Sequence, residues 1–167
     1  MADDVVGGEA PARWLSNDEM AAWVPLAAML VKLPAALDAQ VQRDAGMNHF
    51  EYGVLATLSE APDRTLRINE LAARVSGSLS RLSHLVKRME QRGWVRREPC
   101  PGDSRYQNVV LVDAGWAKVA AAAPGHVAVV RKLVIDPLSA TQLRYLRSIS
   151  TRLVESLKAD EIADKRR

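Results

Sequence analysis

Short polar and basic side chains are concentrated in one stretch of the sequence, which contains Ser78, Ser80, Arg81, Ser83, His84, Lys87 and Arg88. Apolar residues alternate with them at helical spacing, at Leu79, Leu82, Leu85, Val86 and Met89. We therefore expect a single helix with one buried face and one polar face. Hydroxyl and imidazole groups can reach the edges of bases, and an arginine can hold guanine through two parallel hydrogen bonds. This chemistry is recognition of a nucleic acid rather than catalysis.

The elements around this helix must position it. A shorter helix is expected from about Asn69, followed by a Ser-Gly-Ser break at residues 76–78 and an end to the second helix at Gly93. A hairpin is expected next, with Val95–Glu98 pairing with Tyr106–Leu111 around a tip that contains Asp103 and Ser104. Two helices joined by a tight turn and followed by a basic hairpin predict a helix-turn-helix with a wing.

The charge distribution agrees with this interpretation. The chain has 167 residues and a net charge of +3, but the segment from Arg64 to Tyr106 holds ten Lys and Arg residues against four acids. The segment from Met1 to Gly46 holds seven acids against three bases. A concentrated positive segment is typical of a protein that binds a polyanion. If charge were the only signal, a basic face that is simply solvated would be the favoured explanation.

Each candidate contact also has a simpler interpretation. Ser78 could serve only as a helix cap, and His84 could be an ordinary surface histidine. Lys87 and Arg88 are expected at phosphates, which fix register without reading sequence. Arg96 and Arg97 face opposite sides of their strand, so only one should point toward DNA, and Arg97 is preferred.

The remaining segments predict further helices. Ser16 or Asn17 can cap the first, whose apolar residues recur from Trp23 to Val41 and which Pro34 should kink or split before Gly46 ends it. Asn48 and Glu51 have the spacing of a capping box for the next helix, and Thr65–Arg67 is expected to form a short strand. A helix capped by Asp113 should be interrupted at Pro124-Gly125. The last helix has a capping box at Ser139 and Gln142 and an apolar seam at Leu143, Leu146, Ser150, Leu153 and Leu157.

Several classes of protein are disfavoured. The sequence has no Gly-x-Ser-x-Gly, no His-Glu-x-x-His and no phosphate-binding glycine loop, so we do not expect an enzyme. Three scattered histidines and the single Cys100 provide no metal-ligand spacing, and we expect no metal or other cofactor. No apolar run approaches the roughly 18 uncharged residues of a membrane span, and the N-terminus is unlike a signal peptide, so a cytoplasmic location is expected. Cys100 could sense oxidants, but with no second cysteine we favour an incidental residue.

Four segments together carry a family resemblance: EYGVLATLSEAP, INELAARV, SLSRLSHLVKRMEQRGWVRR and GDSRYQNVVLVDAG. From about Trp23 to Leu157 the chain resembles MarR-type transcriptional regulators. In the last segment Asp103, Arg105, Leu111 and Gly115 match the family's wing pattern, and Val112 stands where the family usually has Thr. The resemblance implies a mainly α fold with a small β-hairpin wing and an intertwined homodimer. It also implies that Arg105 enters a minor groove, oriented by Asp103; the alternative is a salt bridge at the tip that does not involve DNA.

This resemblance implies a division of the chain. Residues 1–15 are expected to be a disordered tail, residues 47–112 the winged helix-turn-helix domain, and residues 16–46 and 113–160 a helical dimerisation region. A small-molecule effector, if there is one, should bind between the dimerisation helices and the winged domain. Trp23, His49, Tyr52 and Trp116 could line that site, although each is more often plain core or interface.

The resulting hypothesis is a homodimeric regulator, by default a repressor, that binds double-stranded DNA at a pseudo-palindromic operator and is released by a small ligand. Its expected contacts are Ser78, Ser80, Arg81, Ser83, His84, Lys87, Arg88, Arg97, Asp103, Ser104 and Arg105. Two alternatives remain. A winged-helix protein-interaction module would carry acidic or apolar residues on the outward face of Ser78–Arg92. A non-specific architectural binder would not distinguish one duplex from another.

Overall fold

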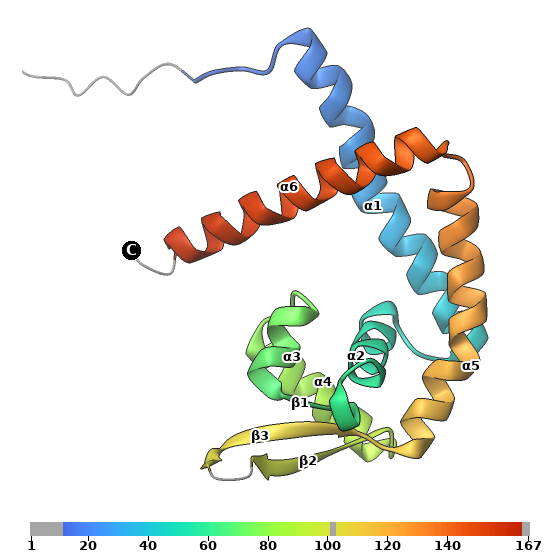
Figure 1. Cartoon of the computed structure of the whole chain (residues 1–167), viewed down its shortest axis with the longest axis vertical. Coiled ribbons are helices and arrows are strands. Elements are labelled where there is room, and N and C mark those ends of the chain that lie inside the picture. The colour runs from blue at the N-terminus through green and yellow to red at the C-terminus, as the bar shows by residue number, and fades with distance from the viewer. Residues whose placement is uncertain (1–11, 101–102, 165–167) are drawn as a thin grey trace, which may run out of the picture.

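The computed structural model describes residues 12–100 and 103–164, without the side chains at positions 103–105, 161 and 164. Its described elements run in the order α1 (Asn17–Ala45), α2 (His49–Ser59), a 3-10 turn, β1 (Thr65–Arg67), α3 (Ile68–Arg74), α4 (Leu79–Gln91), β2 (Val95–Cys100), β3 (Asp103–Leu111), α5 (Asp113–Val130) and α6 (Ala140–Asp164). Figure 1 shows α2, α3, α4 and the strands gathered in one lobe, with α1, α5 and α6 extending away from it. The expected fold class, mainly α with a small β wing, is confirmed.

Capping side chains set several helix boundaries where the sequence predicted them. The Ser16 hydroxyl accepts a hydrogen bond from the Glu19 backbone N–H, and the Glu19 carboxylate accepts one from the Ser16 N–H. Asn48 and Glu51 form the same reciprocal pair at α2, and Ser139 and Gln142 do so before α6. These pairs satisfy backbone donors that a helix N-terminus leaves free.

The predicted interruption of the helix at Pro124-Gly125 is wrong, and of the two outcomes predicted for Pro34, a kink or a split, the split does not occur. α1 continues through Pro34, and α5 continues through Pro124 to a five-residue π-helical turn, Arg131–Ile135. α1 and α5 pack against each other. A Cβ on Gly125 would meet the Asp44 Oδ2 at 2.9 Å, which shows how closely the two helices approach. Tertiary packing at this crossing offsets the hydrogen bond that Pro124 removes.

The lobe is built around a three-stranded antiparallel sheet with the order β1-β3-β2. Thr65 pairs with Val110, and Val95 pairs with Leu111. Against this sheet pack the buried side chains of the three short helices, including Leu55, Leu58, Leu71, Leu82, Leu85, Val86 and Met89. The hairpin is longer than predicted, with strands over residues 95–100 and 103–111.

The start of α5 differs from the sequence prediction. Val112 occupies the N-cap position and makes no side-chain cap, so the expected cap at Asp113 is wrong. The Asp113 carboxylate instead accepts a hydrogen bond from the Arg64 guanidinium at 3.0 Å. This ion pair joins the first turn of α5 to the segment just before β1, and so connects the lobe to the long helices.

The long helices leave large apolar side chains exposed. On α1 these include Trp23, Leu30 and Val31, and on α6 they include Tyr145, Ile149, Leu153 and Leu157. By length and composition alone α1 could cross a membrane, with an 18-residue window of mean hydropathy 1.7, contrary to the interpretation of the sequence. A single such helix is weak evidence for a membrane span, because a helix that packs its apolar face against another protein helix passes the same test.

Candidate nucleic-acid interface

The local sequence around Ser78 explains where α4 begins. The Ser78 hydroxyl accepts a hydrogen bond from the Arg81 backbone N–H at 3.3 Å, which makes Ser78 the N-cap. The turn before it places Ser76 at a positive φ of 52°. Leu82, Leu85, Val86 and Met89 are buried as predicted. Leu79 was expected in the same stripe but is 51% exposed, because it lies in the first turn of the helix, beyond the edge of the core.

The exposed side of α4 has an outer row of four residues, Ser80, His84, Lys87 and Gln91. Their spacing of four, three and four residues puts them on one line along the helix, opposite the buried stripe. Arg81 and Arg88 lie on one flank of this row. Ser83 lies on the other flank and is partly buried. Gln91 was not among the predicted contacts, although helical spacing from His84 and Lys87 would have indicated it.

The one carboxylate of α4 is turned away from the outer row. Glu90 accepts hydrogen bonds from Arg97 on β2, from the guanidinium Nη2 at 2.7 Å and Nε at 2.9 Å and from the backbone N–H at 3.0 Å. These bonds hold the pKa of Glu90 below its usual value. Arg81, Lys87 and Arg88 form no ion pair with any carboxylate that the structure describes. The outward side of α4 is therefore positively charged.

The hairpin of β2 and β3, here called the wing, holds the remaining predicted contacts. The Arg97 guanidinium is occupied by Glu90, and Arg96 pairs with Glu98 at 2.6 Å. Asp103, Ser104 and Arg105 belong to β3, but their side chains lie outside those that the structure describes. Cys100 is buried at the end of β2, which limits access to its thiol.

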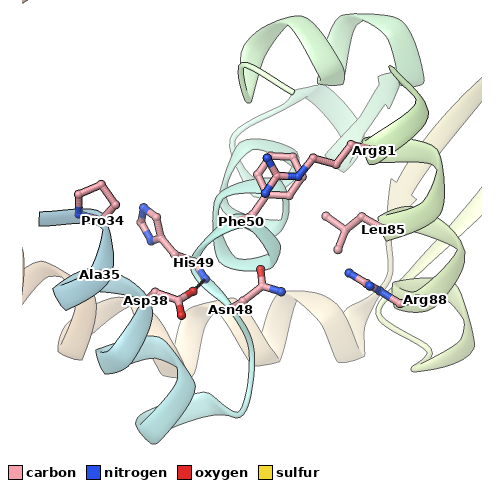
Figure 2. Close-up of a pocket in the computed structure, with 9 residues that line it drawn as sticks. All are labelled: Pro34, Ala35, Asp38, Asn48, His49, Phe50, Arg81, Leu85 and Arg88. Atoms are coloured by element: carbon pink, nitrogen blue, oxygen red, sulfur yellow. Dashed lines mark hydrogen bonds between the residues drawn. The ribbon is translucent and has the colours of Figure 1, made fainter. Parts of the chain in front are cut away.

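A cavity of about 520 Å³ separates α4 from the first helix (Figure 2). Pro34, Ala35 and Asp38 of α1 form one wall, and Arg81, Leu85 and Arg88 of α4 form the opposite wall. Asn48, His49 and Phe50 line it between them. The Asp38 carboxylate accepts a hydrogen bond from the His49 backbone N–H at 2.8 Å. Of the four aromatic residues proposed for an effector site, only His49 lines this cavity.

The other three aromatic residues have different surroundings. Tyr52 is a buried core residue, Trp23 is exposed on α1, and the Arg64 guanidinium lies 5.0 Å from the ring centroid of Trp116. Tyr52 and His49 contact His126 of α5, with ring centroids 4.3 and 5.4 Å from that of His126. Burial and the neighbouring His49 lower the pKa of His126. Within the described residues, no group of three metal-ligating side chains comes together.

Helices α2, α3 and α4 pack against a three-stranded sheet, and α4, the second helix of the helix-turn-helix, is basic on its outward side. These features define the class of protein, which is a winged helix-turn-helix protein. The sequence model of the MarR family matches residues 45–105. The structure is similar to that of Sco3205, a MarR family transcriptional regulator from Streptomyces coelicolor crystallised in complex with DNA. That match has a TM-score of 0.85 and 44% identity over 87% of this chain and 92% of Sco3205.

Two further relatives agree. AbsC, a MarR family regulator from the same organism, has a TM-score of 0.85 and 34% identity over 89% of this chain and 99% of AbsC. The transcriptional regulator PecS of Dickeya dadantii is 33% identical over 109 residues, a match that spans 64% of each protein. The chain belongs to the MarR family of transcriptional regulators.

Proposed function

We propose that this chain is a homodimeric regulator that binds a pseudo-palindromic site in double-stranded DNA and represses transcription by occupying that site. The observation that carries the proposal is the outward side of α4. Its outer row is polar, its flank carries Arg81 and Arg88, and its single carboxylate, Glu90, is neutralised by Arg97. The similarity to Sco3205, whose structure is a complex with DNA, supports this use of the fold.

The proposed contacts divide by chemistry. Ser80, Arg81 and His84 would reach base edges in a major groove, because they lie in the N-terminal half of the exposed side. Lys87 and Arg88 would hold phosphates, and Ser78 would do so at the helix N-terminus. Ser83 is a marginal contact because it is partly buried. In the wing we propose Arg105, oriented by Asp103, as the minor-groove contact, with Ser104 beside it.

We propose that Arg97 contacts a DNA phosphate while its guanidinium still binds Glu90. The Arg97 side chain is about one third exposed, at 34%, and its guanidinium already binds Glu90. One N–H group of an arginine fork can still reach a phosphate while the others hold a carboxylate. In the free protein, however, the bonds to Glu90 give Arg97 a bracing role between the wing and α4.

The exposed apolar surfaces of α1 and α6 support the homodimer. A mainly apolar groove of about 490 Å³ lies between α1 and the chain that leads into α6, and it is lined by Met29, Lys32, Leu33, Ala36, Leu133, Val134, Pro137, Leu138 and Leu146. Burying such apolar surface against a second copy would provide the driving force for association. Two-fold pairing would place the two α4 helices in successive major grooves, about 34–36 Å apart.

We also propose the cavity between α1, α2 and α4 as an effector site. Its volume falls within the range of small-molecule pockets, about 300–1,000 Å³. Arg81 and Arg88 would favour an anionic group, and Phe50 and His49 an aromatic ring. An occupant would contact α1 and α4 at once, so it could change their separation and release DNA. Thermal shift with a panel of aromatic carboxylates, using a cavity-filling Ala35→Trp variant as control, tests this site.

DNA binding is tested by fluorescence anisotropy on a duplex selected by the protein from a random pool. We expect affinity to fall steeply with salt, because each phosphate contact releases counterions. The Arg81→Ala/Arg105→Ala variant should lose most of the affinity. A wild-type protein that binds no duplex at low salt would instead favour the protein-interaction module. Equal affinity for selected and random duplexes would favour the architectural binder.

A further inference from the structure

Phe50, in the first turn of α2, contacts both α4 and the turn that precedes it. The guanidinium carbon of Arg81 lies 4.4 Å from the Phe50 ring centroid, so the cation stacks on the ring. Figure 2 shows the Arg81 side chain reaching from α4 across the ring of Phe50. On the other side, a Cβ on Gly77 would lie 2.8 Å from Cζ of Phe50. One ring therefore contacts both the turn before α4 and an arginine on its flank.

The Gly77 contact shows that the turn is fitted to the ring. Gly77 does not have a positive φ, so its backbone does not require glycine. Its missing side chain instead leaves the space that the Phe50 ring occupies. Gly77 directly precedes the N-cap Ser78, so the ring fixes the chain where α4 begins. The contact between Phe50 and Gly77 therefore helps to set the direction in which α4 begins.

The position of Phe50 is unlike that of a simple core residue. Its side chain is only partly buried and lines two separate cavities, one toward α1 and one toward Arg74 and Val75. Phe50 is not among the fully buried side chains of the core, which include Leu55, Leu82 and Leu85. The Phe50 ring is partly exposed and stacks on the Arg81 guanidinium, which has no carboxylate partner among the described residues. The effect of the ring on Arg81 explains this position better than packing in the core does.

We propose that Phe50 is a positioning residue that holds Arg81 ready for DNA and thereby contributes to sequence specificity. The inference rests on the proposed function of α4. Arginine loses considerable rotamer freedom when it is fixed at a base edge. A guanidinium that already lies on a ring has lost part of that freedom before binding, since the stacked geometry restricts it to one side of the helix. This restriction raises the affinity for the selected duplex, which fixes Arg81 at a base edge. It does not raise the affinity for a random duplex, which holds Arg81 loosely.

The experiment compares Phe50→Leu and Phe50→Tyr with the wild type on two duplexes, the selected one and a random one of equal length. Ordering one arginine accounts for a loss of about threefold to tenfold. We expect this loss for Phe50→Leu on the selected duplex, with random-duplex affinity unchanged within twofold. Phe50→Tyr keeps the ring and should keep the affinity. In an Arg81→Ala background, Phe50→Leu should cause no further loss.

Gly77→Ala provides a second variant that keeps the aromatic residue. Its new methyl group displaces the ring and should reproduce the selective loss, whether or not Phe50→Leu folds well. Thermal melts of both variants establish that they are folded. Equal losses on both duplexes, or a full additional loss in the Arg81→Ala background, would show that Phe50 acts by packing alone and would overturn the inference. A wild type that binds no DNA would instead overturn the proposed function.

Discussion

Glu90 and Arg97 join the last turn of α4 to the first strand of the wing through three hydrogen bonds, all received by one carboxylate. The two elements that would enter adjacent grooves of DNA are thus fixed relative to each other before any DNA is bound. The pair also neutralises the one negative charge of α4.

Replacing Glu90 should therefore loosen the wing. Glu90→Gln is expected to lower the free energy of unfolding by about 1 kcal/mol, because a partly exposed charge-assisted pair is lost. The lowered pKa of Glu90 makes this contribution present above the unfolded value of 4.5 and lost as the pH falls through the folded value. Chemical denaturation at several pH values measures it. Glu98→Gln, which affects only the Arg96 pair, is the matched control, and an equal effect would contradict the proposal.

Replacing Lys87 and replacing Arg81 should weaken DNA binding in different ways. Lys87→Ala removes a phosphate contact, so it should weaken selected and random duplexes alike and reduce the salt slope by about 1. Arg81→Ala should mainly reduce the preference for the selected duplex. Arg147→Ala removes the same charge from α6 and should change neither. If Lys87→Ala weakened only the selected duplex, the assignment of this residue to a phosphate would be wrong.

The histidine contact between α2 and α5 predicts a pH-dependent stability. The pKa of His126 lies below 6.5 in the folded protein, chiefly because of burial and also because of His49. Protons therefore bind preferentially to the unfolded chain, and this residue reduces stability as the pH falls below 6.5. The stability difference between wild type and His126→Gln should shrink between pH 7.5 and 5. The exposed His84→Gln serves as control, and a constant difference for His126→Gln would refute the prediction.

The apolar face of α6 predicts the oligomeric state. Ile149 is 58% exposed within one chain, and a carboxylate in its place would be buried without a partner in a dimer. Ile149→Glu is expected to give a monomer in sedimentation experiments and to weaken DNA binding by removing the second α4 helix. Thr151→Glu introduces the same charge on the polar side of α6 and should leave the dimer intact. A monomeric wild type would exclude the proposed homodimer.

Local signals in the sequence predicted the local features well. Ser16 with Glu19, Asn48 with Glu51 and Ser139 with Gln142 act within a single turn, and their helices begin as expected. Pro124 was misleading because the packing of α5 on α1 near Gly125 outweighs one lost hydrogen bond. The Phe50–Arg81 stack joins residues thirty-one positions apart, and helical periodicity carries no information about such a pair. The Glu90–Arg97 pair likewise depends on how the wing packs against α4. The alternation of side chains along a strand does not specify that packing.

The tight crossing of α1 and α5 near Gly125 constrains how the lobe can move. The long helices α1 and α5 pack against each other, and the chain passes between them and the lobe at two short connections. One is residues 46–48, between α1 and α2, and the other is the single residue Val112, between β3 and α5. Contacts such as the Arg64–Asp113 ion pair and the packing of Tyr52 on His126 also hold the lobe against these helices. In the proposed dimer, a change in the spacing of the two α4 helices would therefore have to alter these contacts, and a ligand bound between α1 and α4 would act at the same junction.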